Sequence, residues 1–415
     1  MAQAPLTPED FRPVNMQAAE AGRLLFYDPI LSGNRNISCG TCHHHEFAGG
    51  DGVPLGIGEG GAGLGPERVA GPAVQKRIPR NAPGLWNLGA RQVRVLFHDG
   101  RLSVSDYYGN GFDSPAEEFL PEGLNSILAA QALFPVTSRF EMTGDQEDNE
   151  ISRAARRRIK EAWPLIAKRV RVIPEYADML TAAYGLDSRE DIGITHIANA
   201  LADFMAVEFR SIDSPYDRTL RGETDAMTPA QRRGMELFFG EAGCADCHSG
   251  KLLSDQEFHA IGLPQFGPGR TRRFDPMPRD VGRMAETDRL EDAYRFRTPG
   301  LRNVALTAPY GHNGAYATLE GIVRQHLDPL AARAAWRPGA VELPEFPGLA
   351  GVDFISLQDA REQARQVAAI DIEPRALSDA QVADILAFLH ALTGAESTEG
   401  RLGRPESVPS GLAVD

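Results

Sequence analysis

The sequence "CGTCH" at residues 39–43 recurs in the same pattern as "CADCH" at residues 244–248. These two stretches contain all four cysteines of the 415-residue chain. C-x-x-C-H is the attachment signature of c-type haem, in which two thiols bind the porphyrin and the next histidine binds the iron. A redox-active or zinc-binding C-x-x-C is the alternative, but it fits poorly with two copies that use every cysteine. The pattern predicts two covalently bound haem c groups, held by Cys39, Cys42, His43, Cys244, Cys247 and His248.

The bulk composition excludes several classes of protein. The chain is 42% hydrophobic and 24% charged, as in ordinary globular proteins. It has no run of about 18 apolar residues, so we expect no membrane span. The net charge of −14 argues against nucleic acid and suits a basic partner. The N-terminus "MAQAPLTPEDF" lacks signal-peptide features, and covalent haem is attached outside the cytoplasm, so we expect a periplasmic protein whose signal peptide has been removed.

The two haem motifs have similar lead-ins, "AGRLLFYDPILSGNRNISCGTCH" and "RRGMELFFGEAGCADCH". Both are typical of a helix that ends in a Leu-Phe-aromatic cluster before the motif, which indicates a weak internal duplication with one haem per domain. With 42 Gly and 29 Pro, most other segments are predicted as loops. The expected fold is therefore mainly α, with two cytochrome c-like haem domains (1–220 and 221–415) and long irregular loops.

Four helical segments can be predicted from apolar spacing and end signals. Residues 190–215 have helical periodicity. Thr228 and Pro229 are a helix cap and a first-turn proline. Residues 377–394 read as a helix that Ser378 caps and Gly394 ends. The stretch "IVRQHLDP" at 322–329 reads as a helix end with Pro329 as the breaker.

Together, five sequence segments resemble the bacterial di-haem cytochrome c peroxidases and MauG-type enzymes, over most of residues 20–395. They are "GRLLFYDPILS" before the first motif, "RNAPGLWN" (80–87), "LFHDGR" (96–101), "CADCHSGKLLSDQEFHAIGLPQ" (244–265) and "FRTPGLRNVALTAPYGHNGAYATLE" (296–320). In this family the N-terminal haem meets peroxide and the C-terminal haem stores and passes electrons.

The resemblance also implies a peroxide site and a calcium site. Gln131, Pro135 and Glu141 match the family spacing of an amide that orients peroxide and a carboxylate that moves a proton between its oxygens. Without that spacing, Glu141 would pass as one of many acidic surface residues. One Ca²⁺ is expected between the haems, bound by the side chain of Asn81 and the backbone carbonyls of Thr307 and Pro309. Read alone, Asn81 would pass as a turn residue before proline.

The axial ligands depart from those of the Met-ligated peroxidases. The loop at 52–77 contains no histidine, so we expect a first haem that is five-coordinate and open to peroxide, as in MauG. The sixth ligand of the second haem falls 17 residues after Pro309, at His326, where the peroxidases have Met and MauG has Tyr. Met277 is the nearest competitor, and a surface role for His326 is the alternative. An imidazole ligand should lower the haem potential relative to a thioether.

Several further residues are expected between and around the haems. His98 replaces the Trp that the family usually has between its haems, and imidazole is harder to oxidise than indole. Trp86, Trp163 and Trp336 are expected in the core, with Trp86 kept as a possible relay. His259 and His312 are expected to bind haem propionates or to shape the second pocket.

The function expected from this resemblance is that of a MauG-like di-haem oxidase, close to the methanobactin-associated MbnH group. Hydrogen peroxide would react at the His43 haem to give a bis-Fe(IV)-like state, which would oxidise an aromatic side chain, such as Trp, of a partner protein. One alternative is a cytochrome c peroxidase that receives electrons from a small cytochrome or cupredoxin. The other is a non-catalytic di-haem electron carrier, which would have no use for Gln131 and Glu141.

Overall fold

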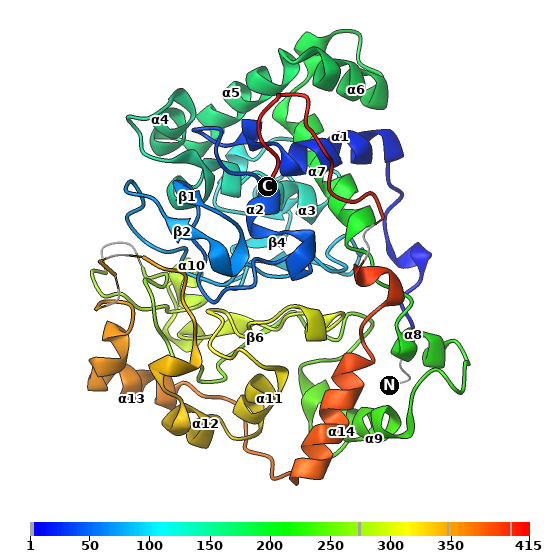
Figure 1. Cartoon of the computed structure of the whole chain (residues 1–415), viewed down its shortest axis with the longest axis vertical. Helices are drawn as coiled ribbons and strands as arrows, with labels where there is room; N and C mark the ends of the chain where they lie inside the picture. The colour runs from blue at the N-terminus through cyan, green and yellow to red at the C-terminus, as the bar shows by residue number, and fades with distance from the viewer. Residues whose placement is uncertain (1–3, 273–274, 347, 350, 399–400) are drawn as a thin grey trace.

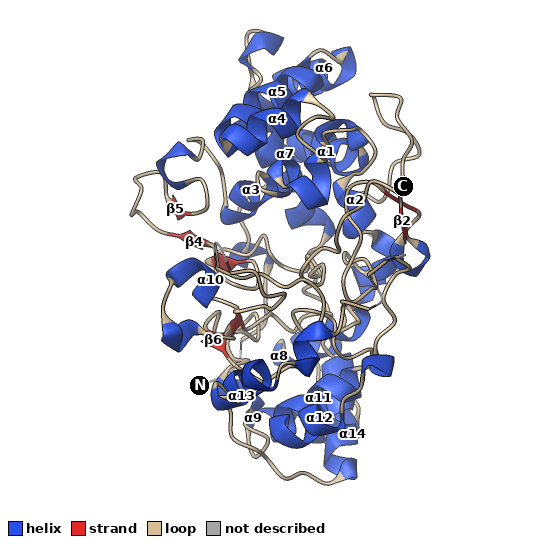
Figure 2. Cartoon of the chain, turned by 90° about the vertical axis from the view of Figure 1, so that its left-hand side faces the viewer, coloured by secondary structure: helices blue, strands red, loops and turns tan. Residues whose placement is uncertain are grey.

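A computed structural model of the chain describes residues 4–272, 275–346, 348–349, 351–398 and 401–415. Helices gather at two ends of the molecule, and irregular chain with short strands fills the middle (Figure 1, Figure 2). The mainly α-helical class is confirmed. The helices are α1 (Met16–Tyr27), α2 (Cys39–Cys42), α3 (Ile127–Ala132), α4 (Glu150–Arg157), α5 (Ile159–Arg171), α6 (Pro174–Tyr184), α7 (Ile194–Glu208), α8 (Pro215–Leu220), α9 (Pro229–Phe239), α10 (Met284–Thr287), α11 (Leu319–Leu327), α12 (Pro329–Ala335), α13 (Ala360–Ala368) and α14 (Asp379–His390).

The strands are two or three residues long and form three small antiparallel sheets. They tie the irregular middle of the molecule together rather than forming a layer. The first sheet pairs β1 (Gly61–Ala62) with β2 (Val69–Ala70), the second has the order β3 (Val95–Leu96), β4 (Leu102–Val104) and β5 (Phe112–Asp113), and the third pairs β6 (Phe258–His259) with β7 (Phe296–Arg297).

The helix before each haem motif packs against a long partner helix through a glycine. A Cβ added at Gly22 of α1 would lie 2.0 Å from the carbonyl oxygen of Ala200 in α7. One added at Gly234 of α9 would lie 1.8 Å from that of Asp384 in α14. Only glycine allows the two backbones to approach so closely. In both halves, therefore, the helix before the motif packs closely on a helix that comes later in the chain, which agrees with the internal duplication predicted from the lead-ins.

Two main hydrophobic cores divide the buried residues. The first takes its members from residues 6–209, with Leu252, and the second from residues 216–392. The last segment returns to the first core, where Leu402, Leu412 and Val414 pack (Figure 1). Trp163 and Trp336 are buried, as expected of core residues. The domain boundary near residue 220 stays a prediction.

Two predicted helix starts are confirmed. Thr228 caps α9 and forms a capping box with Gln231, and Ser378 caps α14 with Gln381 in the same way. In both, the cap hydroxyl accepts the N–H three residues on and satisfies a donor that the helix leaves free.

Of two predicted helix ends, one is wrong and one is confirmed. The prediction that α14 runs to Gly394 is wrong, because it ends at His390. Asn303 donates to the carbonyl of Leu392 and accepts the N–H of Gly394, which draws the chain out of the helix. The helix containing His326 does end before Pro329, at Leu327, but this proline also begins α12.

Candidate functional site: two haem-binding motifs and a shared cavity

The first C-x-x-C-H motif forms the short helix α2 and the residue that follows it. Ser38 caps α2, and the N–H of His43 donates to the carbonyl of Cys39 at 3.0 Å. The Nδ1–H of His43 donates to the carbonyl of Gly49 at 2.8 Å, which leaves Nε2 for a metal. Burial lowers the pKa of His43, so the ring is the neutral form that binds iron.

The second motif repeats this geometry in a 3₁₀ turn, Cys244–Asp246. The N–H of His248 donates to the carbonyl of Cys244 at 2.9 Å, and its Nδ1–H donates to the carbonyl of Leu253 at 3.1 Å. Burial, with a smaller contribution from His326, lowers the pKa of His248 to about 4. Both histidines are thus neutral and oriented by backbone carbonyls, as axial ligands require.

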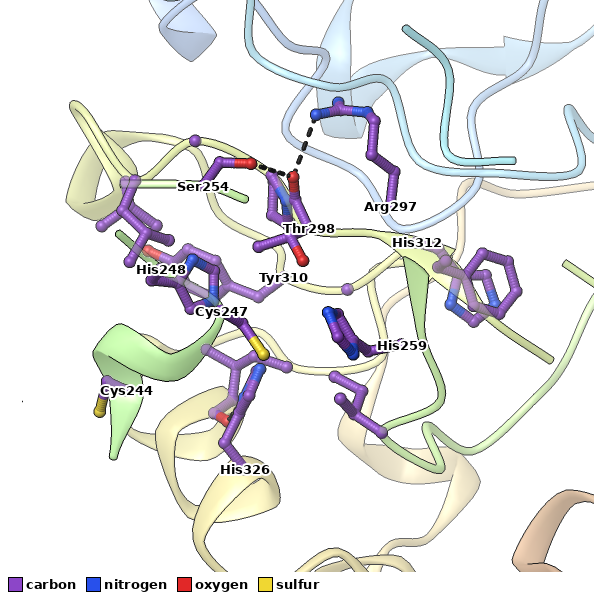
Figure 3. Close-up of a pocket in the computed structure, with 18 of the residues that line it drawn as sticks. Cys244, Cys247, His248, Ser254, His259, Arg297, Thr298, Tyr310, His312 and His326 are labelled. Atoms are coloured by element: carbon purple, nitrogen blue, oxygen red, sulfur yellow. Dashed lines mark hydrogen bonds between the residues drawn. The ribbon is translucent and has the colours of Figure 1, made fainter. Parts of the chain in front are cut away.

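His326 faces His248 across the space that the second haem would occupy. Their ring centres lie 6.2 Å apart, and both rings lie beside the Cys247 thiol (Figure 3). A metal–imidazole bond is about 2 Å long, so an ion shared by two Nε2 atoms would place the ring centres roughly 6 Å apart. The Nδ1–H of His326 donates to the carbonyl of Ile322 at 2.8 Å, and burial lowers the pKa of this ring too. The competing residue Met277 is 45% exposed, which does not suit a haem ligand.

A cavity of about 670 Å³ surrounds these residues and is lined from both halves of the chain. This volume is ample for a cofactor. The second half contributes the motif residues and His326, while the first contributes Trp86 and His98. The cavity is also lined by the predicted calcium ligands Asn81, Thr307 and Pro309. The structure therefore gathers sequence candidates that are more than 200 residues apart into one site.

Arg297 and His312 also line the cavity. Over the part of the chain that the structure describes, Arg297 has no carboxylate partner and His312 has no hydrogen-bond partner for its ring. In the described chain, the guanidinium of Arg297 donates only to the carbonyls of Phe97 and Thr298 (both 3.1 Å), and burial lowers its pKa to about 10 (Figure 3). Within the described residues, neither ring nitrogen of the buried His312 has a hydrogen-bond partner. A half-buried cation and a buried, unpaired imidazole fit carboxylates such as haem propionates. Sequence reasoning missed Arg297, although it lies in the quoted segment "FRTPGLRN".

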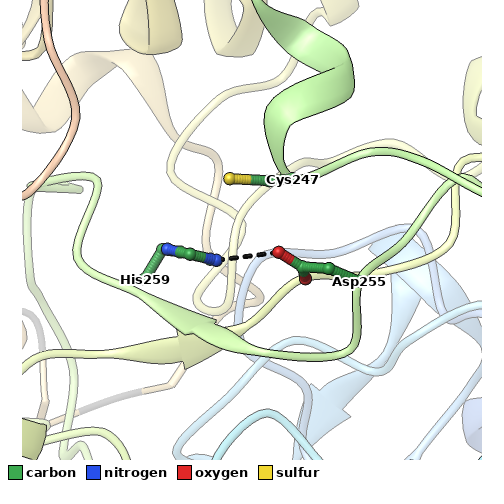
Figure 4. A group of neighbouring side chains, drawn as sticks. All are labelled: Cys247, Asp255 and His259. Atoms are coloured by element: carbon green, nitrogen blue, oxygen red, sulfur yellow. Dashed lines mark hydrogen bonds and ion pairs between the residues drawn. The ribbon is translucent and has the colours of Figure 1, made fainter.

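His259 lies beside the second motif and is held by acidic residues. Its Nε2–H donates to Asp255 at 3.0 Å, and its Nδ1 lies 3.9 Å from Asp371. Figure 4 shows Cys247, Asp255 and His259 together, with ligand atoms within 4.8 Å of one another. Cys247 belongs to the haem motif, so we interpret these three residues as part of the surroundings of the second haem and not as a separate metal site.

Glu141 lies near the first motif, in a single π-helical turn, Arg139–Thr143. Such turns are frequent at functional sites. The thiol of Cys42 has its pKa raised to about 12 by burial, with smaller contributions from Asp51 and Glu141, so the Glu141 carboxylate lies close to the first motif. Gln131 lies near the end of α3, and no contact in the described chain joins its amide to Glu141.

The loop at 52–77 covers the backbone of this π-helical turn. The N–H of Glu59 donates to the carbonyl of Phe140 at 3.2 Å. A Cβ at Gly58 would lie 2.0 Å from that oxygen and 3.0 Å from the Cα of Glu141. The absence of a side chain at Gly58 therefore lets the histidine-free loop close over Glu141.

Trp86 and His98 both line the cavity of the second motif, and Trp86 also contacts the chain that follows the first motif. The indole N–H of Trp86 donates to the carbonyl of Ala48 at 2.8 Å, one residue before the carbonyl that orients His43. His98 donates through Nε2 to the carbonyl of Asn81 at 3.1 Å, and burial lowers its pKa to about 4. A role for Trp86 or His98 in electron transfer between the haems stays a prediction.

The three predicted calcium ligands all line the same cavity. The side-chain amide of Asn81 donates to the carbonyl of Val53 at 2.7 Å, and its backbone N–H donates to that of His312 at 2.8 Å. A Cβ at Gly84 would lie 2.8 Å from the Cγ2 of Thr307, so the segments that carry Asn81 and Thr307 meet closely. These contacts fix Asn81 through its nitrogen and leave its side-chain oxygen for a cation.

Comparison with known proteins agrees with this geometry. A family model for di-haem cytochrome c peroxidase matches residues 16–225. The methylamine utilization protein MauG of Methylorubrum extorquens is 29% identical over 323 residues, covering 78% of this chain and 70% of that protein. Cytochrome c551 peroxidase of Pseudomonas aeruginosa is 26% identical over 384 residues, covering 92% and 80%.

A solved structure extends the likeness to the fold. The crystal structure of a MauG-like protein associated with microbial copper homeostasis superposes with a TM-score of 0.59 at 28% identity, covering 95% of this chain and 94% of that one. Two haem-binding motifs on matching helix pairs, the family match and this fold agree. The chain belongs to the di-haem cytochrome c peroxidase and MauG family of peroxide-dependent oxidoreductases, which have two haem cofactors.

Proposed function

We propose that this chain is a MauG-like oxidase that uses hydrogen peroxide to remove electrons from an aromatic side chain, such as Trp, of a partner protein. The observation that carries the proposal is the 6.2 Å separation of the His248 and His326 rings. Two imidazole ligands favour Fe(III) more than a His–Met pair does. A second haem of this kind suits the storage of oxidising equivalents better than the delivery of electrons to peroxide.

The first haem site supports direct reaction with peroxide. The loop that covers Glu141 contains no histidine between residues 52 and 77, so it offers no imidazole as a sixth ligand for the first haem iron. His44 and His45 follow the proximal ligand too closely to reach the opposite face of the same ring. We therefore expect a five-coordinate first haem that needs no prior reduction.

The protein's own groups would supply proton transfer and orientation. The two haems supply the redox chemistry when bound. Glu141 can take a proton from the inner oxygen of peroxide and return it to the outer oxygen, which assists cleavage of the O–O bond. Gln131 is proposed to orient peroxide through its amide. Arg297 and His312 would hold haem propionates, and His326 would fix the second iron.

We also propose one Ca²⁺ between the two haem sites, bound by the side-chain oxygen of Asn81 and the carbonyls of Thr307 and Pro309. Oxygen-only ligation with backbone carbonyls suits calcium. The ion would join a segment of the first half to one of the second, and so hold the shared cavity together.

Calcium removal should destabilise the wild-type protein and leave the Asn81→Ala variant unaffected. A ligand at 100 times its Kd stabilises the folded state by about 2.7 kcal/mol, and a chelator removes this contribution. The measurement is the change in Tm on adding chelator, with bound calcium determined by elemental analysis. Asn36→Ala, at an exposed asparagine, is the control and should respond like wild type. A wild-type protein that contains no calcium would contradict the site.

The expected setting is the periplasm, where c-type haem is attached, and the expected partner is a protein substrate or a small redox protein. The net charge of −14 would favour a basic partner surface through electrostatic steering. In the described chain, no helix combines the length and apolar character needed to cross a membrane.

One experiment separates the proposed oxidase from its two alternatives. Peroxide is added to the diferric holoprotein without reductant, and optical and Mössbauer spectra are followed. A long-lived species with both iron centres oxidised beyond the ferric state would support the oxidase. A requirement for prior reduction of one haem would favour a cytochrome c peroxidase, which the likeness to cytochrome c551 peroxidase over 92% of the chain also supports. No reaction would favour an electron carrier.

A further inference from the structure

Three side chains outside the haem motifs form a continuous hydrogen-bonded row beside the first motif. The phenol of Tyr27, the last residue of α1, donates to Nδ1 of His45, and Nε2–H of His45 donates to Glu208 at the end of α7. Tyr27 is fully buried, and Glu208 is 2% exposed. The side chain of His45 is 22% exposed, so this middle member reaches solvent.

Tyr27 packs directly on the peptide that carries the first haem attachment. A Cβ added at Gly40, between the two cysteines, would lie 2.4 Å from Cδ1 of the Tyr27 ring. The helices α1, α2 and α7 lie together at one end of the molecule in both views (Figure 1, Figure 2). The Tyr27 side chain therefore contacts the first haem-attachment motif and is shielded from solvent.

The charges in the row are arranged for proton transfer from Tyr27. The second oxygen of Glu208 accepts the N–H groups of Leu402 (2.7 Å), Arg401 (3.2 Å) and Gly403 (3.3 Å). Although burial opposes it, these bonds and the bond from His45 lower the pKa of Glu208, so the carboxylate is anionic. Because the ring nitrogen that meets the Glu208 carboxylate is the donor, Nδ1 of His45 is left as the acceptor for the phenol.

The acceptor matters because oxidation makes a phenol strongly acidic. A buried phenol that cannot release its proton would become a charged radical in an apolar site, which is costly. Transfer to Nδ1 of His45 removes that charge from the ring and places a cation beside Glu208. This makes Tyr27 easier to oxidise than a tyrosine that donates to a carbonyl.

We propose that Tyr27 is a redox-active tyrosine that gives one electron to the first haem site after peroxide has oxidised it. The electron leaves the ring, the O–H bond breaks, and an N–H bond forms at Nδ1 of His45, so the products are a neutral Tyr27 radical and an imidazolium paired with Glu208. A one-electron donor, such as the partner protein, returns the electron, and the proton returns from His45. The proposal rests on the peroxide reaction of the proposed function, and it gives the site a place to store one oxidising equivalent when no substrate is bound.

The test is electron paramagnetic resonance of the diferric holoprotein frozen soon after one equivalent of peroxide is added. We expect a tyrosyl signal that narrows when ring-deuterated tyrosine is incorporated and that is lost in Tyr27→Phe. Tyr176→Phe is the matched control, because Tyr176 is also fully buried and hydrogen-bonded but donates to Asp28 at 2.7 Å. It should keep the signal. His45→Gln should lose most of it while the resting haem spectra stay unchanged.

Failure of this proposal can be told apart from failure of the proposed function. If the Soret band changes with peroxide but no tyrosyl signal forms, or if the signal persists in Tyr27→Phe, the role of Tyr27 is refuted while the proposed reaction with peroxide stands. If peroxide leaves the Soret band unchanged, the oxidase fails, and Tyr27 is then tested with a flash-generated ruthenium(III) oxidant. A tyrosyl radical that is lost in Tyr27→Phe would support a redox-active Tyr27, and a radical that persists in this variant would overturn that role.

Discussion

Replacing His326 with alanine should convert the second haem from low-spin to high-spin. In the wild-type protein the rings of His248 and His326 lie 6.2 Å apart, which matches two imidazoles on one iron. Alanine removes the sixth ligand and leaves His248 in place, still oriented by the carbonyl of Leu253. Optical, magnetic circular dichroism and paramagnetic resonance spectra of the ferric protein measure the change.

His390→Ala is the matched control, because this histidine lies at the end of α14 and is exposed. Its spectra should equal those of wild type. His326→Met should restore a low-spin haem but raise its potential, since a thioether favours Fe(II); a rise of about 60 mV is a tenfold change in the equilibrium of a one-electron couple. A His326→Ala protein with an unchanged low-spin spectrum would show that another residue ligates this iron.

The haem motifs and their helical lead-ins could be predicted because their information is local. Five consecutive residues define each attachment site, and apolar spacing with a capping residue defines α9 and the start of α14. The end of α14 could not be predicted, because Asn303, far away in the sequence, determines where the chain leaves the helix. Pro329 shows the same limit: it is a breaker of one helix and the first residue of the next.

Residues that act through tertiary contacts were found only partly. The spacing from Pro309 indicated His326, but only the fold shows that its ring faces His248. Arg297 was missed, because a single arginine in a two-residue strand carries no local sign that it will line a cavity without a carboxylate partner. Tyr27, His45 and Glu208 were missed for a related reason, since 163 residues separate the last two. Sequence patterns indicate attachment chemistry well and buried polar contacts poorly.

Replacing Glu141 with glutamine should slow the reaction with peroxide by about 10² to 10⁴, the usual contribution of a positioned acid–base group. Glutamine keeps the shape of the side chain but cannot carry a proton between the peroxide oxygens. The π-helical turn that holds Glu141 and the loop packed on it through Gly58 should be unchanged, so the resting spectra of both haems should equal those of wild type. Stopped-flow absorbance of the Soret band gives the second-order rate constant.

The matched control for this substitution is Glu147→Gln, six residues away on the exposed side of the same segment. It removes the same charge from the same region, so it separates proton transfer from a general electrostatic effect on the haem. If the two variants react equally fast, Glu141 has no role in peroxide cleavage. If Glu141→Gln alone is slow, and the haem spectra of both are those of wild type, the loss belongs to the proton transfer. A carboxylate at this position then distinguishes a peroxide-using enzyme from a di-haem carrier, because electron transfer alone requires no proton carrier beside the first iron.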